Sequence, residues 1–137
     1  MSVVIDSSVT LAWCYSDERT EATERVFDIV TEAGAWVPMI WHLEVANGLQ
    51  QGIRQRRIDA AFRSGALADL AEMNIATDPD TNVFAWSDTL ELSDRFRLTL
   101  YDACYLELAQ RRNMPLATLD GDLRAAGNAL GLGLLGA

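Results

Sequence analysis

The segment VVIDSSV at residues 3–9 joins a branched apolar run to a carboxylate and two hydroxyl side chains. A run of this kind favours a short buried strand, which we predict over residues 2–5. Either serine can cap the helix that is predicted next, over residues 8–15. Asp6 stands between the strand and the helix, the position at which α/β folds gather the residues of their sites.

Strands and helices continue to alternate after this opening unit. Gly34 ends the second helix, and Pro38 separates the second strand from the third helix. The remaining predicted helices span residues 20–33, 39–57, 59–73, 81–95, 101–112 and 120–130, and the remaining predicted strands span residues 35–38, 74–77, 115–119 and, at the edge, the glycine-spaced tail. This order predicts an α/β fold in which a mostly parallel sheet is covered by helices on both faces.

Length and composition fit one globular domain over residues 1–137. Half of the residues are apolar, which is enough for a core that needs no disulfide. Cys14 and Cys104 lie far apart among apolar neighbours and are expected to be free, buried thiols. No apolar run reaches the roughly 20 residues of a membrane span, and no basic leader precedes the first strand, so we expect a cytoplasmic protein without membrane contact.

The net charge limits the ways in which the chain can bind nucleic acid. Its net charge is −9, and all 11 basic residues are arginine. A general basic coat is therefore excluded, and any contact with nucleic acid must be local. Two groups of arginines are candidates: residues 54–57, and Arg111 and Arg112 with Arg124. Each group can be an ordinary helix end, where arginine suits the helix dipole, or a phosphate grip or subunit contact.

Four acidic residues stand at the joints of the predicted elements, where they can converge. Asp6 ends VVID, Glu44 lies in HLEVAN, Asp102 in YDACYLELA and Asp120 in LATLDGD. Three have an ordinary alternative role: Asp6 and Asp120 can cap the helices that follow them, and Asp102 fits a capping box with Thr99. Glu44 lies inside its predicted helix with no end to cap, so its alternative is a solvated helix face.

Helix geometry favours a site for two of the four acids. At about 100° per residue, Glu44 shares its side of the helix with Asn47 and Gly48, opposite an apolar arc that includes Leu43. Because no charged residue lies one turn away, that side suits the wall of a cavity. Asp102 lies at the edge of an apolar stripe and is expected to be partly buried. A buried carboxylate needs a compensating cation, and the chain has no lysine to supply one.

The residues that are absent narrow the choice of ion. His42 is the only histidine, and two helix positions turn it about 200° away from Glu44, which favours a packed or interfacial role over catalysis. Without further histidines or a cysteine cluster, zinc is disfavoured. Ligation by oxygen alone selects a hard cation, Mg²⁺ or Mn²⁺.

Four stretches together resemble the motif regions of a known family. VVIDSSV with the following LAW, VPMIWHLEVANGL, LTLYDACYLELA and PLATLDGDL look like the PIN domain, in the small single-domain branch of VapC-type ribonuclease toxins. The resemblance covers nearly the whole chain, in the right order. It implies a PIN-like three-layer α/β fold and a Mg²⁺-dependent endoribonuclease, the toxin of a toxin–antitoxin pair, that cleaves RNA with a metal-activated water; Mn²⁺ can substitute.

The resemblance also implies roles for single residues and for partners. The implied catalytic and metal-binding acids are Asp6, Glu44, Asp102 and Asp120, and the implied polar residues around them are Ser8, Asn47 and Thr118. Asp122 is an open alternative to Asp120, although the TLD context favours Asp120. Whether one or two ions bind is also open. The implied partners are a cognate antitoxin, the RNA substrate and a second copy of the chain in a homodimer.

Other functional classes fit this sequence less well. A receiver-type phosphoaspartate module needs a lysine on its last strand, and a haloacid-dehalogenase-like phosphatase needs an acid where Ser8 stands. A dinucleotide-binding domain needs a glycine-rich turn after the first strand, which DSSV does not offer. The alternative that remains is a PIN-like binding or scaffold module with a weak site.

Overall fold

The sheet confirms the predicted α/β architecture. A computed structural model describes residues 1–137, and its five strands are all parallel in the order β3-β2-β1-β4-β5. The strands are β1 (Val3–Ile5), β2 (Ala35–Val37), β3 (Ile75–Thr77), β4 (Leu116–Ala117) and β5 (Leu134–Leu135). The glycine-spaced tail therefore does form the predicted edge strand.

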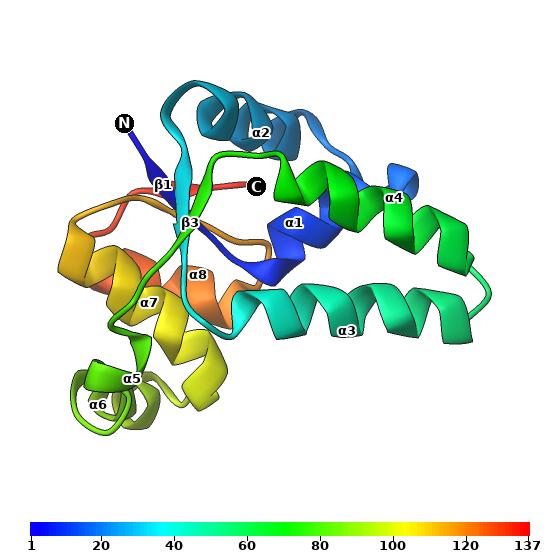
Figure 1. Cartoon of the computed structure of the whole chain (residues 1–137). Helices are drawn as coiled ribbons and strands as arrows, with labels where there is room; N and C mark the ends of the chain where they lie inside the picture. The colour runs from blue at the N-terminus through cyan, green and yellow to red at the C-terminus, as the bar shows by residue number, and fades with distance from the viewer.

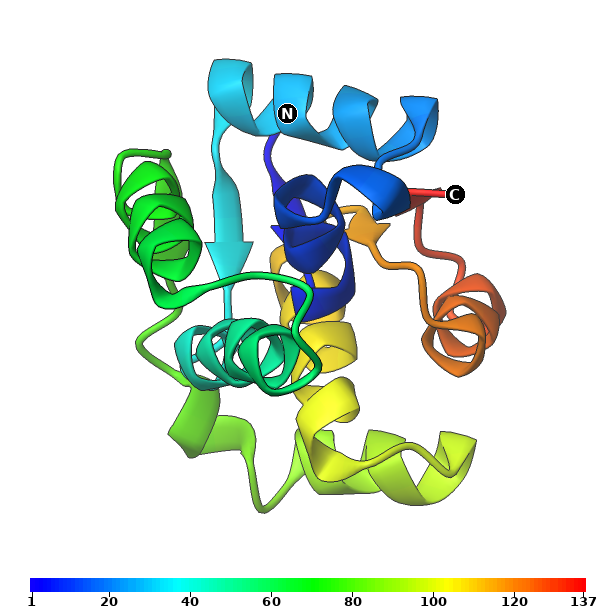
Figure 2. The same ribbon diagram turned by 90° about the vertical axis from the view of Figure 1, so that its right-hand side faces the viewer.

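Eight α-helices and one 3₁₀ turn surround this sheet. They are α1 (Ser7–Cys14), the 3₁₀ turn η1 (Ser16–Glu18), α2 (Glu21–Ala33), α3 (Trp41–Arg54), α4 (Ala60–Ala71), α5 (Thr81–Phe84), α6 (Asp88–Phe96), α7 (Leu100–Arg112) and α8 (Gly121–Ala129). Figure 1 and the view turned by 90° in Figure 2 show α2 and α7 on opposite sides of the sheet. Helices therefore cover both faces, as the sequence predicts.

The chain changes direction across the sheet at β1. From β1 it runs outward to β2 and β3 on one side, and it later returns to place β4 and β5 on the other side. In parallel sheets the crevice at such a switch point, at the carboxyl ends of the strands, is the usual position of a site. Here Ile5 and Ala117 are register partners, so the residues that follow them, Asp6 and Thr118, meet at this crevice.

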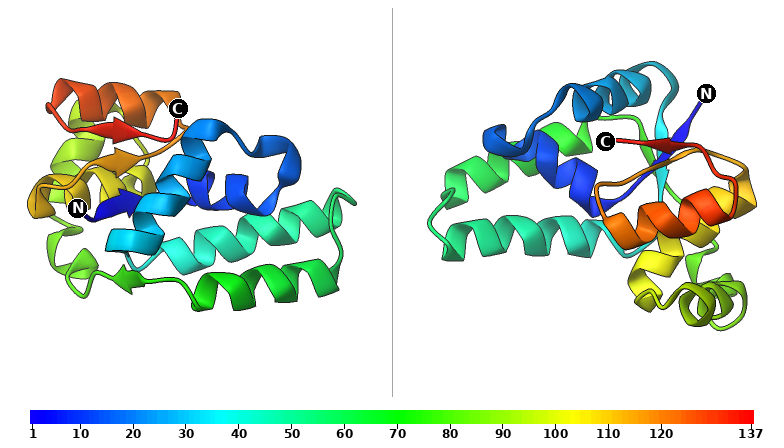
Figure 3. Two further views of the ribbon diagram at one scale, coloured as in Figure 1. Left: turned by 90° about the horizontal axis from the view of Figure 1, so that it is seen from above. Right: turned by 180° about the vertical axis from the view of Figure 1, so that it is seen from behind.

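Helices α3 and α4 form an arm that projects from the rest of the molecule, as both views in Figure 3 show. The arm is attached to α1 at two glycines of α3. A Cβ atom on Gly48 would collide with the Leu11 side chain, and one on Gly52 would collide with the Tyr15 hydroxyl. Tyr15 donates a hydrogen bond to the Gly48 carbonyl at 3.1 Å. The glycines therefore allow α1 and α3 to approach closely.

The largest errors of the sequence prediction concern helix boundaries. The predicted helix over residues 39–57 is shorter, and the one predicted over residues 81–95 is two helices, α5 and α6, separated by a turn. Leu43, which we assigned to the apolar arc of the third helix, is 74% exposed. Val45 and Leu49, which we assigned to the same arc, are buried together with Trp41, because the contact with α1 and the sheet selects that face.

Arg111 and Arg112, at the end of α7, lie in a largely buried ion-pair network. Asp78 follows β3 and is fully buried; it accepts hydrogen bonds from Arg111 Nη2 at 2.7 Å and from Arg112 Nη2 at 3.0 Å. Arg111 Nε also donates to Glu107 Oε2 at 2.9 Å, and the Arg112 guanidinium stacks on Trp36, 3.6 Å from the ring centroid. These arginines connect α7 to the end of β3, so they are neither free helix ends nor a phosphate grip.

The other arginines are divided between structural and exposed positions. Arg124 donates to the carbonyl oxygens of Thr118 and Leu135, and Arg57 pairs with acids of the 3₁₀ turn. Arg54 and Arg56 are exposed and form no ion pair. Both cysteines are free thiols, as predicted, but only Cys104 is buried, and Cys14 is half-buried. No helix has the length and the apolar character that crossing a membrane would require.

Candidate metal centre

Asp6 is held firmly at the carboxyl end of β1. Its side chain is 5% exposed, and its Oδ1 atom accepts hydrogen bonds from the Ser8 hydroxyl at 2.6 Å and the Val9 backbone N–H at 3.1 Å. The Thr118 hydroxyl donates to Oδ2. Asp6 therefore does cap α1, as its ordinary alternative predicts. The capping bond engages one oxygen, and Oδ2 has capacity for a further partner.

Ser8 and Thr118 also connect this carboxylate to the loop that follows β4. The Ser8 hydroxyl accepts a hydrogen bond from the Leu119 N–H at 3.0 Å, and the Thr118 hydroxyl accepts one from the Asp120 N–H at 3.0 Å. Each of the two hydroxyl groups thus donates a hydrogen bond to Asp6 and accepts one from the backbone of the loop that carries Asp120. Both were among the polar residues expected near the acids, and the structure places both in direct contact with Asp6.

Glu44 lies in the first turn of α3, because the helix begins at Trp41 and not near Met39 as predicted. Our expectation that it has no helix end nearby was therefore wrong. An acid in the first turn is favoured by the helix dipole. Its Oε1 atom accepts a hydrogen bond from the Tyr105 hydroxyl at 2.6 Å, which connects α3 to α7. The sequence analysis did not identify Tyr105 as a site residue.

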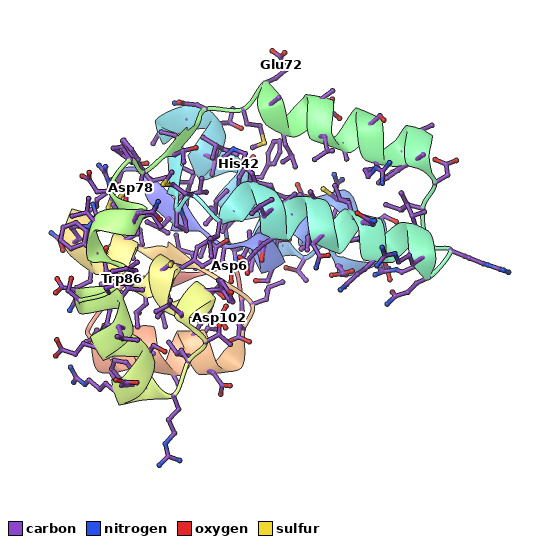
Figure 4. All side chains as sticks on the ribbon, turned by 60° about the horizontal axis from the view of Figure 1, so that its bottom comes forward. Asp6, His42, Glu72, Asp78, Trp86 and Asp102 are labelled. Atoms are coloured by element: carbon purple, nitrogen blue, oxygen red, sulfur yellow. The ribbon has the colours of Figure 1, made fainter.

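Asp102 lies in the first turn of α7 and is half-buried, as predicted. The Thr99 hydroxyl accepts a hydrogen bond from the Asp102 N–H at 3.1 Å, so Thr99 caps the helix. In a full capping box the Thr99 backbone N–H would also donate to the Asp102 carboxylate, and this reciprocal bond is absent. Figure 4 shows Asp102 beside Asp6. A capping box therefore does not explain why an acid occupies position 102.

Asp120 and Asp122 both stand on the exposed rim of the site. Asp120 caps α8, since its Oδ2 atom accepts a hydrogen bond from the Leu123 N–H at 2.8 Å. Its Oδ1 atom accepts none. Both residues are close enough to Asp102 for their charges to act on it. The choice between them as the fourth acid therefore stays open.

The acids influence one another electrostatically. Burial raises the pKa of Asp6, of Glu44 and of Asp102 above the usual values of these carboxyl groups. Neighbouring negative charges add to this effect: Asp102 raises the pKa of Asp6, both of these acids raise the pKa of Glu44, and Asp120 and Asp122 raise that of Asp102. These acids, drawn from four separate elements, therefore share one region of negative potential.

The acids are not tightly gathered, and one expected neighbour makes no hydrogen bond to them. Asn47 is exposed, and its side chain makes no hydrogen bond. His42 is exposed and packs edge-to-face on Trp41, with ring centroids 4.9 Å apart, which agrees with the packed role predicted for it. No three acid, histidine or cysteine side chains stand close enough together to enclose a metal ion as they are placed. The largest hollow, of about 620 Å³ between α1, α2 and α4, is lined by none of the four acids.

The donor set nevertheless fits a hard divalent cation. Every candidate ligand is a carboxylate oxygen, and their mutual repulsion is the kind that a cation relieves. Mg²⁺ usually keeps several waters and takes one or two carboxylates directly, so a closed cage of protein ligands is not required. Oδ2 of Asp6, Oε2 of Glu44 and the Asp102 carboxylate are the oxygens with capacity left for such an ion.

Without a divalent ion, we expect the protein to lose stability as the pH rises. The folded pKa values of Asp6, Glu44 and Asp102 lie above the unfolded values of 3.8, 4.5 and 3.8. Their contribution to stability is therefore complete below these values and is lost as the pH rises through the folded values. Urea unfolding in EDTA should therefore give a free energy of unfolding that falls as the pH rises above the unfolded values of 3.8 and 4.5. A Glu44→Gln variant should show a shallower fall, and equal slopes would contradict the assignment.

Comparisons with known proteins give the family of similar chains. The PIN domain family model matches residues 3–129. Ribonuclease VapC3 of Pyrobaculum aerophilum is 29% identical over 123 residues, which cover 90% of this chain and 92% of that relative. The matched residues of the family model include all four predicted acids.

Solved structures agree in fold. The Mycobacterium tuberculosis toxin VapC20, described as cleaving the sarcin-ricin loop, superposes with a TM-score of 0.66 at 19% identity and covers 91% of this chain and 95% of its own. VapBC2 of Rickettsia felis, bound to a DNA fragment from its promoter, gives a TM-score of 0.61 at 11% identity over 98% of this chain and 97% of that one. Because the family model spans nearly the whole sequence, from β1 to the end of α8, this chain belongs to the PIN domain family.

Proposed function

We propose that this protein is a metal-dependent endoribonuclease and the toxin of a toxin–antitoxin pair. The observation that carries the proposal is the buried Asp6 at the switch point of the sheet, beside which α7 places Asp102 and α3 places Glu44. The name of the VapC3 relative and the description of VapC20 support ribonuclease and toxin activity.

The acids would have different roles at the ion, either as direct ligands or as residues that hold its waters. Asp6 and Asp102 are the proposed direct ligands of the ion, and Glu44 and Asp120 would hold its waters or a second ion. A bound Mg²⁺ or Mn²⁺ would lower the pKa of a coordinated water and offset negative charge on the phosphodiester. Ser8 and Thr118 keep the Asp6 carboxylate oriented, and Tyr105 does so for Glu44. We place Asn47 as a polar residue of the outer wall.

RNA must approach a protein whose charge repels phosphates. Since Arg111, Arg112 and Arg124 are engaged in internal contacts, they are poor candidates for guiding the strand. Arg54 and Arg56 are exposed near the tip of the α3–α4 arm. Arg54 lies ten residues beyond Glu44, which is roughly 15 Å along the helix axis. We propose that these two arginines contact phosphates at a distance from the cleaved bond.

Two protein partners belong to the same proposal. The likeness to VapBC2 and the toxin name of VapC20 support a cognate antitoxin, and we also propose a homodimer. The main alternative is a PIN-like binding or scaffold module with a weak site. The spacing of the acids, no three of which enclose an ion as they stand, is the observation that favours it.

The simplest test is cleavage by the purified protein. RNA should be cut in the presence of Mg²⁺ or Mn²⁺, and EDTA should stop the reaction, because the acids cannot neutralise one another without a cation. Gel analysis of a defined RNA before and after chelation measures this directly. Addition of excess Mg²⁺ should restore cleavage. Cutting that survives EDTA would exclude the metal mechanism, and no cutting with either ion would favour the scaffold alternative.

A further inference from the structure

Tyr105 is a buried side chain whose hydroxyl group the packing of the core does not explain. Its ring belongs to the hydrophobic core, and the residue is 1% exposed. A phenylalanine would fill the same space. A buried phenol needs a hydrogen-bond partner, and Tyr105 finds one in Oε1 of Glu44, 61 residues away in sequence. The hydrogen bond to Glu44 therefore explains why this buried position carries a hydroxyl group.

The hydrogen bond between Tyr105 and Glu44 has the length of a charge-assisted bond. Its O–O distance is 2.6 Å, whereas neutral hydroxyl bonds cluster near about 2.7–2.8 Å. A phenol carries a proton to donate and a carboxylate only accepts, so Tyr105 is the donor and the Glu44 carboxylate is the acceptor.

Glu44 needs such a restraint because its surroundings repel it. Its side chain rotates about three torsions, and the charges of Asp102 and Asp6 act against it. An unrestrained carboxylate would turn outward into water. Tyr105 lies three residues after Asp102 and therefore on the same face of α7. One helix thus supplies one acid of the site and holds a second acid, carried by α3, beside it.

We propose that Tyr105 is a positioning residue whose hydroxyl holds Glu44 in the acidic site and thereby sets the affinity of the site for a divalent cation. The inference rests on the proposed function, since it assumes that the acids bind a cation. A phenol has a single proton to donate, so the Tyr105 hydroxyl occupies Oε1 and does not engage Oε2. The bond to one oxygen orients the Glu44 carboxylate, and the other oxygen stays available to a cation.

The test compares Tyr105→Phe with the wild-type protein and with Tyr101→Phe. Tyr101 lies on the same helix, is 60% exposed and makes no hydrogen bond through its hydroxyl, so it is a matched control. Binding of Mn²⁺ alone, without RNA, is followed by the electron paramagnetic resonance of the free ion. Tyr105→Phe should weaken binding by about 10-fold, which is the usual cost of removing a group that orients a metal ligand. Tyr101→Phe should bind as the wild type does.

A double-mutant cycle separates positioning from simple packing. In a Glu44→Gln background the Tyr105 hydroxyl has no carboxylate to orient, so adding Tyr105→Phe should change Mn²⁺ affinity no further. A packing role predicts instead the same loss in both backgrounds. The cycle stays informative if Tyr105→Phe lowers the melting temperature, because all variants are compared in their folded range. RNA cleavage by Tyr105→Phe should recover as Mn²⁺ is raised to saturation.

The outcomes distinguish this inference from the proposed function. Equal Mn²⁺ affinity of the wild type and Tyr105→Phe, with RNA still cleaved, would overturn the role of Tyr105 alone. Weakened binding that depends on Glu44, in a protein that does not cut RNA, would support the positioning role and overturn the ribonuclease proposal. A wild-type protein that neither binds Mn²⁺ nor cuts RNA would overturn both.

Discussion

Replacing Asp102 with asparagine is expected to abolish metal-dependent RNA cleavage without destabilising the metal-free protein. The loss should exceed about 100-fold, which removal of a residue that merely supports a metal ligand can already reach. The asparagine would keep the shape of the side chain and the backbone hydrogen bond to Thr99. It would remove one charge from a set of acids whose pKa values are raised by burial and mutual repulsion. Unfolding in EDTA should therefore show equal or greater stability.

The matched control for this change is Asp28→Asn. Asp28 is exposed on α2 and takes part in no ion pair or side-chain hydrogen bond, so the same change of charge there should leave cleavage unaffected. Initial cleavage rates at saturating Mg²⁺ and urea unfolding in EDTA are the two measurements. A clear loss of stability in Asp102→Asn, with cleavage lowered only in proportion to the folded fraction, would mean that Asp102 serves the fold and not the chemistry.

Replacing Asp78 with asparagine should have the largest effect on stability. The fully buried carboxylate pairs with both Arg111 and Arg112, and its loss would leave Arg112 without an ionic partner and Arg111 with Glu107 alone. Breaking a buried ion pair in this way costs about 3–5 kcal/mol, and we expect about 3 kcal/mol because both arginines are partly exposed. Asp80→Asn, at an exposed position two residues later, should change stability little. Equal unfolding midpoints for the two variants would contradict this role.

The same network should make the protein sensitive to acid. Burial alone would raise the pKa of Asp78, but the hydrogen bonds from Arg111 and Arg112 outweigh it and hold the pKa below the usual value of 3.8. The stability that this carboxyl contributes is therefore complete above pH 3.8 and is lost as the pH falls through the lower folded value. This is opposite in sign to the contribution of Asp6, Glu44 and Asp102. Asp78→Asn should lack the loss of stability that the wild type shows below pH 3.8.

Local sequence signals predicted the helices and strands better than they predicted which faces of these elements are in contact. The alternation of strands and helices, the edge strand in the tail and the half-buried state of Asp102 were all confirmed. Apolar periodicity alone could not tell that Leu43 faces outward, because the face of α3 that becomes buried is chosen by α1 and the sheet. The turn that divides residues 81–95 was missed because no glycine or proline marks it.

In the candidate site, too, some residues could be proposed from the sequence and others only from the structure. The resemblance to the PIN domain grouped Asp6, Ser8, Thr118 and Asp120 from the sequence, whereas the contacts among them depend on the pairing of β1 with β4. Tyr105 could not be proposed from the sequence, since a tyrosine in an apolar helical stripe reads as an ordinary core residue, and its partner is carried by another helix. The ion-pair network of Asp78 was missed in the same way, because its members lie 33 and 34 residues apart.

The sequence by itself determined the α/β class, the number of strands and the family resemblance, and it singled out four acids as candidates, because each of these depends on local pattern and residue type. Only the tertiary structure decided which groups meet: the strand order that brings Asp6 beside Thr118, the hydroxyl of Tyr105 on Glu44 and the arginines on Asp78. Such contacts depend on how distant elements pack, and packing is a property of the whole chain that no single segment encodes.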